Sequence, residues 1–207
     1  PDCSQVTNVL PRGVGVGVTR PLRHATTGVG APSLRVVVPE RLTPVLRELA
    51  PLAVRFREAG HRLYLVGGTV RDLFVGSGRD DFDLDLTTDA RPSEIKRCLE
   101  GWADAIWTQG EKFGTIGAQV RDTETGFERI YEITTFRAEA YTDESRKPHV
   151  VFADEIEADL SRRDFTVNAM AVRITAEGPG EFLDPLGGLH AVRRRILDTP
   201  AAPEISF

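Results

Sequence analysis

Cysteine, lysine and long apolar runs are scarce in this 207-residue sequence. The two cysteines, Cys3 and Cys98, are too few for a disulfide framework, which favours a reducing compartment. No apolar run approaches the roughly 20 residues that a helix needs to cross a bilayer. The first ten residues also lack the basic and apolar blocks of a signal peptide. We therefore expect a cytoplasmic protein with no membrane partner.

Positive charge is carried almost wholly by arginine, because lysine occurs only at Lys96, Lys112 and Lys147. The formal net charge of −5 argues against a strongly basic protein that coats nucleic acid. It leaves room for an RNA substrate, because a small basic patch on an acidic protein can suffice. In so arginine-rich a chain, a single Arg-Arg or Arg-Asp pair is weak evidence of a site.

Composition divides the chain into three segments. Residues 1–33 are rich in Gly, Val, Thr and Pro and follow no helix or strand period, so we expect disorder or an extension outside the fold. Residues 34–198 carry the periodic patterns of one folded domain. Residues 199–207 resemble a loop, and we expect them to begin a linker to a further part of the protein.

Hydrophobic periodicity predicts a mixture of helices and strands. The expected helices cover Pro39–Glu58, 70–76, Pro92–Leu99 and Ile156–Arg163. Within the first helix, Pro51 should cause a kink or divide the helix in two. The expected strands cover Leu63–Val66, Asp81–Thr87, Ala105–Trp107, Thr115–Val120, Glu128–Thr134 and Met170–Ile174. The fold class is therefore α/β or α+β, with a small mixed sheet flanked by helices.

Three aspartates alternate with apolar residues between Asp81 and Leu86. Residues two apart share one face of a strand, so Asp81, Asp83 and Asp85 should point together while the apolar residues enter the core. Neighbouring carboxylates about 5 Å apart repel by roughly 3 kcal/mol at an effective dielectric of about 20, which favours a bound cation such as Mg²⁺. The alternative is a solvated acidic face on an edge strand, which prevents aggregation.

A glycine pair, Gly67 and Gly68, follows the buried strand at 63–66 and precedes a short helix. Such a turn lets backbone N–H groups approach an anion, and the helix dipole adds to the attraction. Arg71 on the first turn can reach a phosphate oxygen, with Asp72 beside it. The alternative is an ordinary strand-to-helix turn that leaves Arg71 and Asp72 exposed.

A second basic element begins at Arg162 and Arg163. Two adjacent arginines can bind a triphosphate and neutralise charge in the transition state. Asp164 or Asn168 could cap a helix or orient an arginine. The alternative is compositional, because Arg-Asp pairs occur elsewhere in the chain.

Glu132 offers a further carboxylate within the expected strand at 128–134. It could join the metal-binding pair if its strand lies beside the aspartate strand. The alternative is an exposed glutamate on the outer face of a strand.

Five motifs in order, GGTVRD, DLDLTT, FGTIG, YEITTFR and RRDFTVNA, resemble the head domain of class II tRNA nucleotidyltransferases, the CCA-adding enzymes, and of the related bacterial poly(A) polymerases. The resemblance extends from about Tyr64 to Ile196 and includes DPLGG at Asp184–Gly188, beyond the last of the five motifs. It implies a nucleotidyltransferase palm that transfers nucleotides from CTP and ATP to the 3′ end of tRNA and releases pyrophosphate.

The resemblance also implies roles for particular residues. Asp83 and Asp85 would hold Mg²⁺, with Asp81 as the second choice of ligand. Gly68 and Arg71 would bind the incoming ATP or CTP. Arg163 would contact the triphosphate, with support from Arg162, Asp164 and Asn168.

The resemblance leaves the acceptor and product open. A poly(A) polymerase, an enzyme that adds part of CCA and a catalytically silent nucleotide- or RNA-binding regulator remain alternatives, and the oligomeric state is open too. In the family, an acidic-arginine motif in a helical neck reads the base. No such motif stands before Phe207. We therefore expect this chain alone to bind nucleotide weakly, with little preference between C and A, and to be nearly inactive.

Overall fold

The computed structural model describes residues 40–76, 84–140 and 149–200. By contacts the chain divides into two units, Pro1–Leu34 and Arg35–Phe207, and all described residues belong to the second. The expected domain limits at 33 and 198 stay predictions. Asp81 and Asp83 lie outside the described residues.

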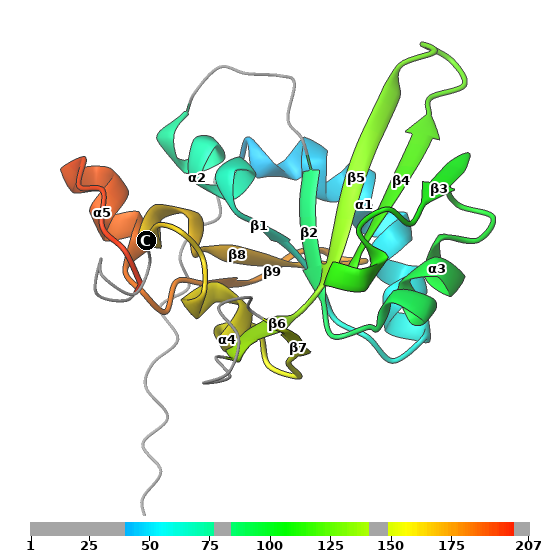
Figure 1. Ribbon diagram of the computed structural model, residues 1–207. Helices are drawn as coiled ribbons and strands as arrows, with labels where there is room; N and C mark the ends of the chain where they lie inside the picture. Colours follow the sequence, from blue (N-terminus) through cyan, green and yellow to red (C-terminus); the bar gives the residue numbers. More distant parts are fainter. Residues whose placement is uncertain (1–39, 77–83, 141–148, 201–207) are drawn as a thin grey trace, which may run out of the picture. The chain divides into compact units, whose positions relative to one another are not determined.

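The described residues alternate between helices and strands (Figure 1). The helices are α1 (Leu42–Glu58), α2 (Gly68–Val75), α3 (Pro92–Leu99), α4 (Ile156–Ser161) and α5 (Gly188–Arg194), with 3-10 turns η1 (Glu111–Phe113) and η2 (Thr166–Asn168). The strands are β1 (Leu63–Val66), β2 (Leu84–Thr88), β3 (Ala105–Trp107), β4 (Thr115–Arg121), β5 (Glu128–Thr135), β6 (Arg137–Ala140), β7 (His149–Phe152), β8 (Ala171–Thr175) and β9 (Gly178–Leu183).

Seven strands form one sheet in the order β3-β4-β5-β2-β1-β8-β9. Only the β2–β5 pair is parallel, so the sheet is mixed, as the sequence predicted. Strands β6 and β7 form a separate antiparallel pair.

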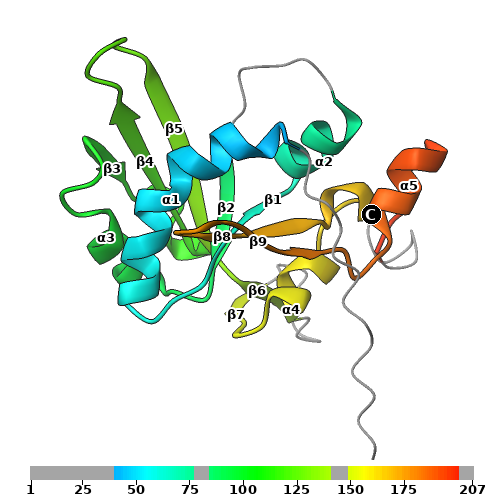
Figure 2. The same cartoon turned by 180° about the vertical axis from the view of Figure 1, so that it is seen from behind.

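Helices cover both faces of the sheet. Helix α1 crosses one face, where it contacts α3 and strands β1, β8 and β9 (Figures 1 and 2). Its stripe of Leu42, Val45, Leu46, Leu49, Leu52 and Phe56 is buried against that face. Pro51 lies inside α1, which continues as one helix, so Pro51 does not divide it, and the kink expected there stays a prediction.

The opposite face carries a smaller core that α4 covers. Strand β1 joins the two cores, because Leu63 and Leu65 enter the core under α1 while Tyr64 and Val66 enter the other. The period of two in β2 is confirmed, since Leu84 and Leu86 are buried under α1 and Asp85 is half-buried on the opposite face. The face beneath α4 is therefore the one that presents Asp85.

Candidate functional site

Two carboxylates lie side by side at the centre of the sheet. Asp85 on β2 is the register partner of Glu132 on the parallel strand β5. Glu132 is exposed and Asp85 half-buried, and both line a cavity of about 220 Å³. The strand of Glu132 thus lies beside the aspartate strand, which was the condition for Glu132 to join the metal-binding pair.

Three arginines, Arg137, Arg162 and Arg163, line the same cavity as these two carboxylates. Guanidinium groups facing carboxylates across a small polar cavity suit a ligand that carries phosphate together with a cation, because each charge then has an opposite partner.

A buried carboxylate, Asp159 on α4, holds the arginines in place. It is 1% exposed, and its oxygens accept hydrogen bonds from Arg162 Nη2 at 3.2 Å and Arg163 Nη2 at 3.3 Å. The backbone N–H of Arg137 donates to the same carboxylate at 3.2 Å. A charge this deeply buried is tolerated only when it is paired in this way.

Asp159 and Arg137 were missed by sequence reasoning. The spacing of Asp159 to Arg162 and Arg163, three and four residues within the helix expected over Ile156–Arg163, is the signal that could have identified the anchor. Arg137 gives no such local signal, because it is the first residue of β6, just after β5, and reaches the cavity from there. Burial lowers the pKa of the Arg137 guanidinium, and the positive charge of Arg162 acts in the same direction.

Gly67 brings three of the predicted motifs together. Its backbone has φ 75° and ψ −144°, a conformation that glycine adopts at little cost. A Cβ atom built there would lie 3.1 Å from Arg163 Nη1 and 3.5 Å from Asp85 Oδ2. The glycine turn, the acidic strand and the Arg-Arg motif therefore converge at one point.

A second polar cluster lies beside the turn, on α2 and η2. Arg71 donates from Nε to Asp72 Oδ1 at 2.8 Å and from Nη1 to Asn168 Oδ1 at 2.6 Å. Asn168 in turn donates from Nδ2 to Asp164 Oδ1 at 3.0 Å. The structure thus joins four predicted site residues in one network. None of the four lines the cavity, so the contact of Arg71 with a triphosphate stays a prediction.

Of the two expected metal ligands, the described residues include Asp85, and Glu132 is the carboxylate beside it. Asp85 and Glu132 are hard oxygen donors of the kind that Mg²⁺ takes, and their adjacency fits a divalent ion. Within residues 40–76, 84–140 and 149–200, no cluster of three His, Cys, Asp or Glu side chains forms a complete metal site. Asp83 precedes Asp85 by two residues but lies outside these ranges.

A larger cavity, of about 450 Å³, lies between the end of α1 and α3. Two arginines and two glutamates line it, together with His61 and Cys98, so it has no excess of either charge. Burial raises the pKa of the Cys98 thiol, which disfavours a reactive thiolate. The smaller cavity under α4 is the better candidate because the predicted motifs meet there.

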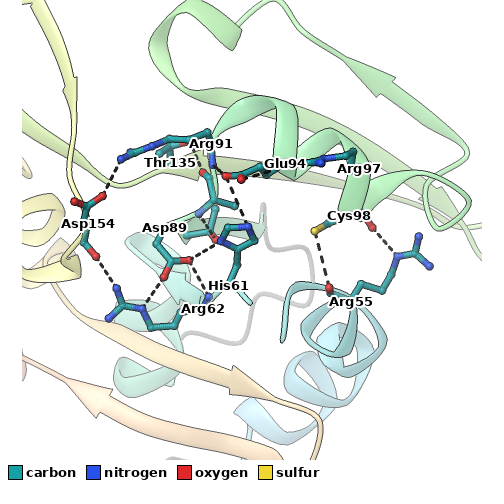
Figure 3. A network of polar contacts seen from close by, with 12 residues as sticks. Arg55, His61, Arg62, Asp89, Arg91, Glu94, Arg97, Cys98, Thr135 and Asp154 are labelled. Carbon is teal, nitrogen blue, oxygen red and sulfur yellow. Dashed lines mark hydrogen bonds and ion pairs between the residues drawn. The ribbon is translucent and has the colours of Figure 1, made fainter. Parts of the chain in front are cut away.

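Ion pairs and hydrogen bonds join the start of β1 and the end of β2 to the segment that precedes α4 (Figure 3). Asp89, just after β2, accepts a hydrogen bond from the backbone N–H of Arg62 at 2.9 Å and from its Nε at 2.8 Å. Arg62 also donates to the backbone oxygen of Asp154, and Arg91 donates to the carboxylate of Asp154 at 2.8 Å. These bonds tie β1 and β2 to the segment that leads into α4, and so help to fix Asp159.

The model of the poly(A) polymerase head domain matches residues 63–198, more than half of the chain. CCA-adding enzymes of Bacillus subtilis and Bacillus velezensis are 40% and 39% identical to it over 165 and 158 residues. These matches cover 79% and 76% of this chain and 36% of each relative. The chain thus spans little more than a third of the length of these relatives.

Solved structures agree with the sequence matches. A Bacillus stearothermophilus CCA-adding enzyme in complex with CTP superposes with a TM-score of 0.60 at 34% identity, covering 79% of this chain and 35% of that one. A Thermotoga maritima CCA-adding enzyme complexed with tRNA superposes with a TM-score of 0.58 at 25% identity, covering 78% and 34%.

Proposed function

Because the chain belongs to the poly(A) polymerase head-domain family, we propose that it carries the nucleotidyl-transfer site of a tRNA nucleotidyltransferase. Such an enzyme adds CCA, or part of it, to the 3′ end of tRNA from CTP and ATP. The similarity to CCA-adding enzymes in complex with CTP and with tRNA favours this acceptor and these nucleotides. A cytoplasmic location, where these substrates occur, is part of the proposal.

One observation carries the proposal: the Asp85–Glu132 pair faces Arg162 and Arg163 across a single cavity. Nucleotidyl transfer needs negative groups that hold a metal ion next to positive groups that hold a triphosphate. A solvated acidic strand would not require arginines anchored opposite it by a buried aspartate. The alternatives without a chemical role, namely a solvated acidic strand, an ordinary strand-to-helix turn and a compositional arginine pair, are therefore disfavoured.

In the proposed reaction, the 3′-hydroxyl of the acceptor gives up its proton to solvent and its oxygen forms a bond to the α-phosphorus. The bond from that phosphorus to the bridging oxygen breaks, and pyrophosphate leaves. Arg162 and Arg163 neutralise the charge that grows on the pyrophosphate, while the Gly67 turn admits the phosphates close to the backbone.

Asp83 and Asp85 would hold Mg²⁺, with Glu132 as the adjoining carboxylate. When bound, the ion supplies a lower pKa for the attacking hydroxyl and compensation for phosphate charge. Arg71, with Asp72, Asp164 and Asn168 around it, would bind the incoming nucleotide from the side of α2.

The test uses tRNA trimmed of its CCA end, labelled CTP or ATP, and protein in excess so that slow transfer is detected. Products are resolved one nucleotide at a time. We expect limited addition of C and A by the unchanged protein and none by Asp85→Ala. The exposed Glu157→Gln on α4 serves as the matched control, because it also removes one negative charge.

The products distinguish the alternatives. Long runs of A without C would indicate the poly(A) polymerase of the same family. Binding of nucleotide or RNA that is unchanged in Asp85→Ala, without any transfer by the unchanged protein, would indicate the silent regulator and refute the enzymatic proposal.

A further inference from the structure

Four residues form one row across the sheet: Trp107, Gly117, Glu132 and Asp85. Trp107 on β3 pairs with Gly117 on β4, Gly117 pairs with Glu132 on β5, and Glu132 pairs with Asp85 on β2. Directly paired residues point to the same face of a sheet. Trp107 therefore lies on the face of the two carboxylates, at the outer end of their row.

The indole of Trp107 covers Gly117. A Cβ atom at Gly117 would lie 2.0 Å from both Cε2 and Nε1 of the indole, so any side chain at this position would displace the ring. The neighbours Ile116 and Ala118 are buried in the core under α1, which confirms that Gly117 faces the opposite side. The ring thus extends across the sheet from β3 toward β5, where Glu132 stands.

Packing alone does not explain why a tryptophan occupies position 107. Trp107 remains partly exposed, and its side chain makes no ring contact or hydrogen bond with the described residues. Trp102, by contrast, packs against buried Tyr131 at a centroid distance of 5.2 Å on the core side. An aromatic ring that lies on a sheet beside two catalytic carboxylates is suited to stack on a base.

The in-line geometry of the proposed reaction determines which base lies near Trp107. In an in-line displacement at phosphorus, the attacking and leaving oxygens lie on opposite sides of the phosphorus. Arg163 approaches Gly67, after β1, so the leaving pyrophosphate lies on the β1 side of Asp85. The attacking hydroxyl must then come from the β5 and β4 side. Trp107 stands two strand spacings beyond Glu132, about 10 Å away, which is within the reach of one nucleotide.

We propose that Trp107 is a stacking platform for the 3′-terminal base of the acceptor RNA, seated by Gly117 next to Glu132. This rests on the proposed function, because it takes the acceptor to be RNA with a free 3′-hydroxyl. It assigns the two ends of the row: the leaving pyrophosphate lies toward Gly67 and Arg163, and the acceptor lies toward Trp107.

The chain offers a direct optical test, because Trp102 and Trp107 are its only tryptophans. In the Trp102→Phe protein, emission comes from Trp107 alone. The probes are a hairpin RNA with a short single-stranded 3′ overhang, the same hairpin with a blunt end, and ATP without RNA. We expect the overhang to quench Trp107 emission and the blunt hairpin and ATP to leave it nearly unchanged.

A kinetic test complements the optical one. We expect Trp107→Ala to raise the KM for acceptor RNA about tenfold, with little change in the KM for nucleotide, and Trp107→Phe to restore most of the loss. If Trp107 only packs on Gly117, both variants should lower the thermal midpoint without changing either KM, and that result would overturn the proposal.

The remaining outcomes separate this proposal from the function itself. Quenching by ATP as strong as that by the overhang would place the incoming base on Trp107 and overturn the assignment of sides. Binding of labelled RNA, seen by anisotropy, without quenching would overturn the platform while leaving the enzymatic proposal intact. Absence of both RNA binding and nucleotide transfer would overturn both.

Discussion

The buried carboxylate of Asp159 is the feature whose removal tests the site most directly. Its substitution by asparagine keeps the shape of the side chain and removes the negative charge opposite Arg162 and Arg163. At a nitrogen–oxygen distance of 3.2 Å and an effective dielectric of about 20, one such pair attracts by roughly 5 kcal/mol before desolvation is subtracted.

The net effect is smaller than this attraction. Removing one partner of a buried ion pair costs about 3–5 kcal/mol, because the other charge stays buried without compensation. Arg162 and Arg163 are 22% and 19% exposed, so water offsets part of the loss. We therefore expect Asp159→Asn to lower the free energy of unfolding by about 3 kcal/mol, which corresponds to a fall in Tm of roughly 6–12 °C for a domain of this size.

Urea unfolding and calorimetry measure this change, with Glu157→Gln on the exposed side of α4 as the matched control. Affinity for ATP with Mg²⁺ should fall as well, since the arginines lose their anchor. A loss below about 1 kcal/mol together with unchanged ATP affinity would show that Asp159 does not position the arginines, and would refute the account of the cavity.

Three further changes test other parts of the structure. Gly67→Ala should cost about 1–3 kcal/mol through its positive φ and should weaken ATP binding, because the new methyl meets Arg163; an unchanged urea midpoint would contradict this. Arg137→Ala should weaken triphosphate binding about tenfold by calorimetry, and equal affinity would exclude it from the site. Backbone N–H groups, chiefly that of Thr125, lower the pKa of Asp122, so its contribution is present above the unfolded pKa of about 3.9 and lost as pH falls through the lower folded value. Asp122→Asn should therefore be slightly less stable at pH 7, with the difference vanishing in acid; a difference independent of pH would contradict this.

Some elements escaped prediction because they depend on distant partners. Strand β9 contains Gly178, Pro179 and Gly180 and reads as a loop, but it pairs with β8 at the edge of the sheet, where proline is tolerated. Helix α5 begins at the second residue of the glycine pair Gly187-Gly188, and its first N–H groups are held by Asp184, which accepts bonds from Gly188 at 2.6 Å and Leu189 at 3.0 Å. Helix α4 ends at Ser161, so Arg162 and Arg163 lie just beyond it rather than inside it.

The sequence by itself determined the local features of this protein. Helical and strand periods placed α1, α3 and the inner strands, and the period of two put Asp85 on the face opposite Leu84 and Leu86, because these patterns depend only on neighbours along the chain. The motifs also predicted the family to which the chain belongs.

Only the tertiary structure decided which of these features meet. The parallel pairing of β2 with β5 put Glu132, 47 positions along the chain, beside Asp85. The burial of Asp159 beneath the sheet fixed two arginines opposite them, and the seating of Trp107 on Gly117 placed a ring on the same row. Strand order, register and burial arise from packing between segments far apart in the chain, and no local pattern of residues encodes them.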